Sequence, residues 1–213
     1  MTLGDVLGFS DPQERVFGRI LQLVLLGILL YGLATLQFGM AANGGLALAV
    51  TLLPALLRRE YGYSMDAGLV LWITVAVFLH SVGSLGPYTW FPWYDSVTHT
   101  ISATVIAGTG YAALRAFERH SDDIDVPSKF RAVFIVVFVL AAGVVWEILE
   151  FASGGLASIT GTQAPLTVMG IDDIVSDMIF NTAGAVIVAA WGTCYVGGFV
   201  AFLGRRLRSE SGD

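Results

Sequence analysis

The sequence predicts an all-α integral membrane protein, a single domain of six transmembrane helices with both termini in the cytoplasm. Hydrophobic residues make up 55% of the 213 residues and charged residues only 13%, about half the charged share of soluble domains. Apolar runs of about twenty residues, the length of a transmembrane helix, recur along the chain. Helices are expected because a membrane-spanning segment must satisfy its backbone polar groups internally.

The first half of the chain predicts three spans. The first span covers about 16–38, and a tight turn at Ala42–Gly45 separates it from a second span at about 44–58. This second run is short and contains Pro54, so it needs its flanking residues to cross a bilayer. The third span covers about 67–84.

An aromatic segment follows the third span. Residues 86–94 contain five aromatic residues and two prolines. Tryptophan and tyrosine anchor proteins at membrane interfaces, so we interpret the segment either as a plain anchoring loop or as a wall of a site.

The second half predicts three more spans, which cover about 95–117, 130–151 and 173–203. Residues 118–129 are polar and predict a solvated loop. Residues 152–171 carry no charge and contain four glycines. They are too broken for a span and too apolar for an ordinary exposed loop, which favours a lid, a re-entrant segment or a packed connection.

The basic residues orient the predicted bundle. All eleven Lys and Arg residues fall near the termini or in the connections after the second and fourth spans. Cytoplasmic loops carry such an excess of Lys and Arg, so these ends are predicted to be cytoplasmic in a cell (plasma) membrane. Six of the seventeen acidic residues lie on the opposite side, which accounts for the formal net charge of −6.

The composition also limits the partners. No basic patch favours nucleic acid, and the single cysteine excludes an internal disulfide. An acidic chain with one Lys against ten Arg is typical of proteins from salt-loving organisms. The predicted partners are therefore membrane lipids, and the composition does not indicate an oligomeric state.

The six outer acidic residues and two histidines are predicted to form one polar site. The members are His80, Asp95, His99, Glu147, Glu150, Asp172, Asp173 and Asp177. Most of those sharing a helix are three or four positions apart, so each helix presents one polar face. A rise of ~1.5 Å per residue places all of them near the outer membrane boundary. Charge facing lipid is costly, so these faces are expected to point into the bundle.

Carboxylates and imidazoles without a nearby cation favour a metal site. Such groups either share protons or bind a metal, as carboxylates and histidines do in helical bundles. Oxygen ligands with one or two histidines suit Mg²⁺, Mn²⁺, Fe or Zn²⁺, and the sequence does not choose among these divalent metal ions. The predicted ligands are Asp95, His99, Glu147, Asp173 and Asp177, and the candidate general base is Glu150.

Three further residues are interpreted in two ways. His80 is either a member of the site or a helix-end histidine satisfied near Ser84. Asp172 fits an N-terminal cap, which the helix dipole favours, better than a ligand. Asn181 fits a residue that supports a ligand or links two helices.

Three short motifs cover the predicted site. A Tyr-Asp-x-x-x-His stretch begins at Tyr94 and a Glu-x-x-Glu-aromatic stretch begins at Glu147. An Asp-x-x-x-Asp-Met stretch begins at Asp173 and precedes Asn181 and a Gly-Ala pair. Across about residues 65–190, the chain resembles the YjdF-type family of small bacterial and archaeal inner-membrane proteins, and more faintly VanZ-like proteins. The third motif has Ile-Val-Ser where the family is expected to have polar residues. The resemblance implies a small polytopic membrane protein and no particular reaction.

Three functions fit this site. The first is a metal-dependent, hydrolase-like enzyme acting on a lipid or amphiphile at the outer leaflet, with a metal-activated water as nucleophile. The second is a cation or proton transporter or channel, because intramembrane acids mark ion pathways, although the predicted inner half lacks a charged relay. The third is a metal- or partner-binding protein without catalysis. An open ligand position would favour the enzyme over the third function.

Overall fold

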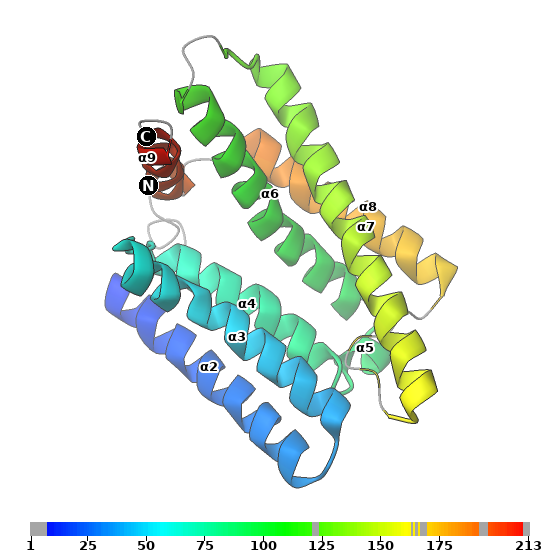
Figure 1. Cartoon of the computed structure of the whole chain (residues 1–213). Helices are drawn as coiled ribbons and strands as arrows, with labels where there is room; N and C mark the ends of the chain where they lie inside the picture. Colours follow the sequence, from blue (N-terminus) through cyan, green and yellow to red (C-terminus); the bar gives the residue numbers. More distant parts are fainter. Residues whose placement is uncertain are drawn as a thin grey trace.

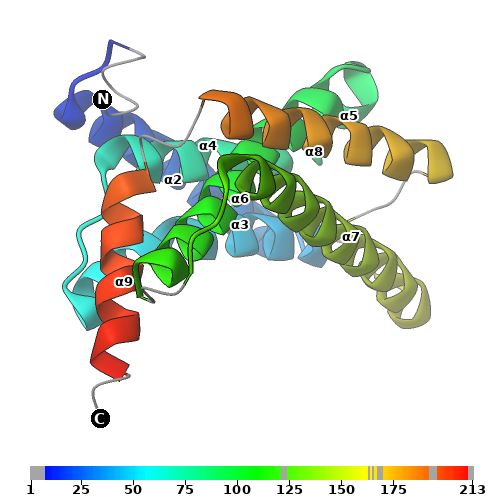
Figure 2. The same cartoon turned by 90° about the horizontal axis from the view of Figure 1, so that it is seen from above.

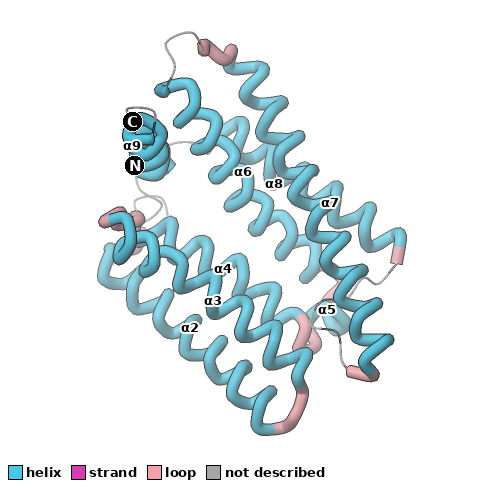
Figure 3. The backbone as a smooth tube through the Cα atoms, viewed as in Figure 1, coloured by secondary structure: helices cyan, strands magenta, loops and turns pink. Residues whose placement is uncertain are grey.

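The computed structural model describes residues 8–120, 124–162, 164, 166, 170–191 and 196–210. All regular structure within these residues is helical (Figure 3), which confirms the predicted all-α class. Two groups of long helices lie against each other, and a C-terminal helix lies across one end of them (Figures 1 and 2).

The first group contains three neighbouring helices, α2 (Asp11–Ala34), α3 (Phe38–Tyr61) and α4 (Ala67–Gly83). A capping box between Ser10 and Gln13 starts α2, because each side chain bonds to the other residue's backbone. The buried core of this group contains Leu25, Ile28 and Ala47.

The connection between α2 and α3 lies earlier than predicted. The predicted turn at Ala42–Gly45 is wrong, because these residues belong to α3 and the chain turns at residues 35–37 instead. A Cβ added at Gly44 would lie 3.0 Å from the backbone nitrogen of Leu29, so this glycine allows close helix packing. Leu36 forms the turn with a φ of 57°, which is uncommon for a residue other than glycine. The second predicted span is thus a full helix of 24 residues.

The second group contains α6 (Tyr94–His120), α7 (Ser128–Thr160) and α8 (Ile171–Trp191). Its buried core contains Ala103, Ala107, Ile135, Val139, Ala185 and Val188. A hydrogen bond joins the two groups, because the indole Nε1 of Trp72 on α4 donates to Thr104 Oγ1 on α6 at 2.8 Å. The helix α6 contacts α4, α7, α8 and α9, so it is the central helix of the fold.

Two glycines bring α8 close to its neighbours. A Cβ added at Gly184 would lie 2.5 Å from the carbonyl oxygen of Thr100 on α6. A Cβ added at Gly143 on α7 would lie 2.7 Å from Met178 Cε and 2.9 Å from Asn181 Nδ2 on α8. These close approaches fix which faces of α6, α7 and α8 meet.

One residue of the predicted solvated connection, Glu118, is buried, whereas most of the described residues from 124 to 129 are exposed as predicted. Glu118, which was expected in a solvated loop, lies in the last turns of α6 with a side chain only 5% exposed. Its carboxylate pairs with Arg115 at 2.5 Å and with Arg131 of α7 at 3.1 Å, and it accepts the backbone N–H of Val126. This network ties the end of α6 to the start of α7.

The fifth predicted span continues well past its expected end. Helix α7 has 33 residues, so the first part of segment 152–171 is helical, and its prediction as a broken segment is wrong there. Gly154 and Gly155 meet no atom within 4 Å of an added Cβ, and each glycine weakens a helix by only about 1 kcal/mol. The helix ends at Gly161, whose left-handed φ of 67° is a common helix cap. The rest of the segment is only partly described, and a lid there stays a prediction.

The sixth predicted span, 173–203, consists of two helices. After α8, the separate helix α9 (Gly197–Glu210) is seen end-on in Figure 1 and lengthwise in Figure 2. Val196 and Val200 pack against Ala112 of α6. The apolar pattern therefore continues beyond α8 because α9 buries its own apolar face on α6.

The lengths and outer faces of four of the described helices fit a lipid bilayer. Four helices, α2, α3, α7 and α8, are long and apolar enough to cross a membrane, and α4 is apolar but shorter, with 17 residues. Large apolar side chains are exposed on the outer faces, among them Leu23 at 66%, Val133 at 59% and Ile179 at 60%. Extensive apolar exposure of this kind marks contact with a membrane or a partner.

Candidate metal centre

Asp95, His99 and Asp177 form the centre of the site. Asp95 and His99 lie one turn apart at the start of α6, and Asp177 lies in the second turn of α8. The Nε2 atom of His99 is 3.5 Å from Oδ1 of Asp95 and 3.5 Å from Oδ2 of Asp177. One ligand atom of each residue lies within 4.8 Å of the other two. The structure therefore brings together three of the five predicted ligands in one compact group.

The centre is buried on all but one side. The side chains of His99 and Asp177 are 6% and 2% exposed, whereas that of Asp95 is 28% exposed. The carboxyl groups of Asp95 and Asp177 lie within hydrogen-bonding reach of each other. Asn181, one turn deeper on α8, lies within such reach of His99, which agrees with a supporting role. Asp95 is therefore the most exposed of the three residues.

Glu147 of α7 is a buried carboxylate beside this centre. It is 7% exposed, and neither of its oxygens has a hydrogen-bond partner among the described residues. Gly143, one turn earlier, packs against Asn181 and so directs this face of α7 toward α8. Oδ1 of Asp177 is likewise buried without a hydrogen bond in the described part of the chain. Buried charge without a partner is costly, so these oxygens are suited to bind a cation or a proton.

Asp173 and Glu150 lie at the edge of the site. Asp173 interacts electrostatically with Glu147 and Asp177, and Glu150 interacts with Glu147, Asp173 and Asp95. Neither belongs to the compact group of three residues. The five predicted ligands and the candidate base thus occupy one region, in which Asp173 and Glu150 are peripheral.

The aromatic segment 86–94 packs against α4 and lies beside the site, and its role as a membrane anchor stays a prediction. It contains the short helix α5 (Pro87–Trp90). The hydroxyl of Tyr94 donates to the carbonyl of Leu79 at 3.0 Å, which closes the segment onto α4. Trp90 is 66% exposed, as expected of an interfacial anchor.

Tyr88 of α5 was not predicted as part of the site, yet it holds His80. Its hydroxyl lies 2.8 Å from Nδ1 of His80, and the His80 ring lies edge-on to His99 with centroids 5.3 Å apart. Burial, followed by the nearby acidic groups, raises the pKa of Tyr88, so the phenol stays protonated and can donate to Nδ1. Ser84 is not the partner of His80, because its hydroxyl bonds to a carbonyl of α4. His80 therefore lies beside the centre, where its ring contacts that of His99, but it is not one of the three residues of the compact group.

Asp172 and Trp146 lie outside the compact group of three residues. Asp172 is exposed in the first turn of α8 and lies outside the compact group, where the helix dipole favours an acid. Trp146 lies with its ring 5.3 Å from that of His80 and was not predicted. In the sequence, only its position directly before Glu147 indicates that Trp146 lies near the site.

The donor set determines what the site can do. Carboxylate oxygens with one imidazole are ligands for hard or borderline divalent cations, and such a cation would offset the charge of the buried carboxylates. The unpartnered oxygens of Glu147 and Asp177 fit that role.

The fold and this site define a polytopic helical membrane protein with a buried carboxylate–histidine centre. The chain belongs to the family described as Predicted membrane protein (DUF2238), whose model matches residues 17–198. No curated protein and no solved structure matches the chain.

Proposed function

We propose that this protein is a metal-dependent, hydrolase-like membrane enzyme that acts on a lipid or another amphiphile. The observation that carries the proposal is the compact group of Asp95, His99 and Asp177, whose ligand atoms lie within 4.8 Å of one another. Glu147 adds two buried oxygens without hydrogen bonds among the described residues. The metal is Mg²⁺, Mn²⁺, Fe or Zn²⁺, which are the ions that suit this donor set.

Each residue has a proposed role. Asp95, His99 and Asp177 hold the ion, and Glu147 and Asp173 complete its surroundings. A bound divalent ion supplies Lewis acidity and lowers the pKa of a coordinated water. Glu150, at the edge of the site, accepts the proton as general base, a role worth roughly 10²–10⁴-fold in rate.

A groove beside the centre supports an amphiphilic substrate. It has a volume of about 340 Å³ and lies between α6 and α8. Trp93, Val97, Ile101 and Phe180 give it a mainly apolar lining. Its α6 residues include Ser96 and Thr100, which directly follow Asp95 and His99 in the sequence. An acyl chain in the groove would therefore lie against the same turns of α6 as the centre, on the neighbouring face of the helix.

The catalytic part of the proposal is tested by turnover. Purified protein is incubated with short-chain phospholipids and a total polar-lipid extract, with and without Mn²⁺ or Zn²⁺, and products are followed by mass spectrometry. Metal-dependent product formation is expected, and Glu150→Gln is expected to abolish most of it while metal content stays unchanged. No product under any of these conditions would refute the enzyme and leave a metal-binding protein.

That second function, metal binding without catalysis, is favoured by the burial of the centre. His99 and Asp177 leave only 6% and 2% of their side chains exposed. A transporter is less well supported, because the apolar core cluster of α6, α7 and α8 lies between the centre and the opposite end of these helices. Metal uptake into sealed vesicles would favour transport.

The proposal includes six membrane-crossing helices in a cell (plasma) membrane, with cytoplasmic termini and an extracytoplasmic metal centre. In Figure 1, the start of α2, the end of α3, the end of α6 and α9 lie at one end of the bundle, and α5 lies at the other. In a Cys194→Ser background, a cysteine at Thr35 should react with an impermeant maleimide in intact cells, and one at Ser64 should not. Labelling of the cysteine at position 64, without labelling of the one at position 35, would mean that the opposite orientation is correct.

The likeness to YjdF-type proteins, and more faintly to VanZ-like ones, stays part of the proposal, because its motifs carry the site residues.

A further inference from the structure

Glu147 lies beside the compact group of Asp95, His99 and Asp177 without belonging to it. It is 7% exposed, and both of its carboxylate oxygens are buried without a hydrogen bond among the described residues. It interacts electrostatically with Asp95 and with Asp177. Its oxygens nevertheless do not join the set of ligand atoms that all lie within 4.8 Å of one another. Glu147 therefore borders a position next to the compact group.

The packing of α7 on α8 places Glu147 opposite Asp177. The two helices run in opposite directions (Figure 1) and approach closely at Gly143, where an added Cβ would lie 2.9 Å from Asn181 Nδ2. Glu147 follows Gly143 by four residues, and Asp177 precedes Asn181 by four residues. Residues four apart share one face of a helix, so both carboxylates lie one turn from this contact, toward the same end.

The two carboxylate oxygens of Asp177 have different surroundings. Oδ2 lies 3.5 Å from Nε2 of His99, inside the compact group. Oδ1 is buried without a hydrogen bond in the described part of the chain. An ion held by the compact group would use the side of the carboxylate that faces His99, so Oδ1 can serve as a ligand for a different ion.

The site also has more negative charge than one divalent ion offsets. Asp95, Asp177, Glu147 and Glu150 carry four negative charges when ionised, and Glu150 interacts electrostatically with Glu147. Residues 60–114 and 132–204, which supply every residue of the site, contain no Lys or Arg. One divalent ion offsets two of these charges, and buried charge without a partner is costly. A second divalent ion would offset the other two.

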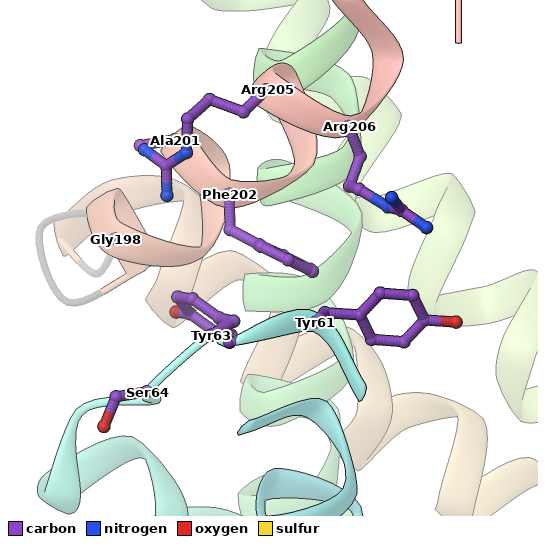
Figure 4. A pocket seen from close by; sticks show the side chains of 9 residues that line it. Tyr61, Tyr63, Ser64, Gly198, Ala201, Phe202, Arg205 and Arg206 are labelled. Carbon is purple, nitrogen blue, oxygen red and sulfur yellow. The ribbon is translucent and has the colours of Figure 1, made fainter. Parts of the chain in front are cut away.

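The large pocket at the other end of the molecule is not suited to such an ion. It lies between α9 and the connection from α3 to α4 and has a volume of about 650 Å³ (Figure 4). Arg205 and Arg206 are among its lining side chains, and none of the described residues that line it is acidic. Hard divalent cations bind oxygen ligands, carboxylates above all, so a second ion is expected beside the first.

We propose that the site holds two divalent metal ions that share the carboxylate of Asp177. The first ion is bound by Asp95, His99 and Oδ2 of Asp177, and the second by Oδ1 of Asp177 and by Glu147. Two carboxylates and water suffice for an ion such as Mg²⁺, and ions in two-metal sites lie about 3.5–4 Å apart. This inference rests on the metal centre of the proposed function and adds a second ion to it.

The test counts the ions that the full-length protein binds in a neutral detergent. The protein is loaded with Mn²⁺, separated from free metal, and studied by elemental analysis and EPR spectroscopy. We expect two Mn²⁺ per chain in the wild type, with magnetic coupling between them, because a shared carboxylate holds the ions close together. Glu147→Gln should lose one ion and the coupling. His99→Gln should lose the other ion and the coupling, and Asp177→Asn should lose both ions.

Asp172→Asn is the matched control, because it changes an exposed acid in the first turn of α8. This variant should keep two coupled ions. One Mn²⁺ per chain in both wild type and Glu147→Gln would overturn the second ion and leave a single-ion centre. Loss of all Mn²⁺ from Glu147→Gln, with wild-type helix content by circular dichroism, would also overturn it, because Glu147 would then belong to one undivided site.

The same measurement separates this inference from the proposed function. Wild-type protein that binds no Mn²⁺ would overturn the second ion together with the metal centre itself. Two coupled ions in a protein that turns over no lipid would support the second ion and count against the enzyme only.

Discussion

The Nε2 atom of His99 on α6 lies 3.5 Å from the Oδ2 atom of Asp177 on α8. Both side chains are almost completely buried. Their contact depends on the close approach of the two helices at Gly184, two turns beyond Asp177. The proposed metal centre therefore depends on helix packing as much as on the polar residues themselves.

Replacing Gly184 with valine should separate α6 from α8. A Cβ there would lie 2.5 Å from the Thr100 carbonyl oxygen and 2.7 Å from Ala103 Cβ, and overpacking of this kind costs about 1–3 kcal/mol. Thermal unfolding in detergent should show a lower Tm, and metal titration should show weaker binding. Gly154→Ala is the control, because an added Cβ there meets nothing within 4 Å. A Gly184→Val protein as stable as wild type would contradict this view of the interface.

Replacing Glu147 with glutamine should have opposite effects on stability and on metal binding. The carboxylate is 7% exposed and its oxygens lack hydrogen bonds among the described residues. Removing its charge should stabilise the metal-free protein by on the order of 1 kcal/mol and weaken metal binding. Glu60→Gln, at an exposed carboxylate, should change neither quantity. If Glu147→Gln destabilises the metal-free protein, the carboxylate has a structural role instead.

Tyr88→Phe should weaken the metal centre indirectly. The variant removes the hydroxyl that lies 2.8 Å from His80 Nδ1 and leaves the ligands in place. Because His80 packs on the ligand His99 and is not itself one of the three proposed ligands, the loss should be smaller than the about 10–100-fold that removing a direct partner of a ligand costs, and His99→Gln should cost more. Tyr94→Phe is the matched control from the same segment, because its hydroxyl bonds to the backbone of Leu79. Equal metal affinity in wild type and Tyr88→Phe would place His80 outside the site.

Metal affinity should fall as the pH falls. Carboxylate and imidazole ligands must lose their protons before they bind a metal, so binding releases protons. Isothermal titration between pH 7.5 and 5.5, in buffers of different ionisation enthalpy, measures both effects. A constant affinity without proton release would mean that the acids hold no exchangeable protons at these pH values.

The sequence was informative about the site because helical spacing is a local property. Asp95 and His99 are four residues apart and do share a face of α6. The position of Tyr88 depends on how α5 folds back on α4, and periodicity does not encode that. For the same reason, Glu118 was expected in solvent, whereas its partner Arg131 lies on the next helix.

The errors in the fold have a common physical cause. Small residues mark both turns and close helix contacts, so Gly44 suggested a turn where α3 packs on α2. The true turn contains Leu36 in a left-handed conformation, which the sequence does not signal. An apolar run also cannot show that the chain changes direction, and α9 was therefore joined to α8.

The most direct test of the central claim is the metal content of the purified protein, measured by elemental analysis after titration with Mg²⁺, Mn²⁺, Fe²⁺ and Zn²⁺. Asp177→Asn is compared with Asp172→Asn, which changes an exposed acid in the same helix. We predict a stoichiometric divalent metal in wild type and Asp172→Asn and its loss in Asp177→Asn. Wild-type protein that binds none of these metals, or equal metal in all three proteins, would contradict the assignment of the metal centre.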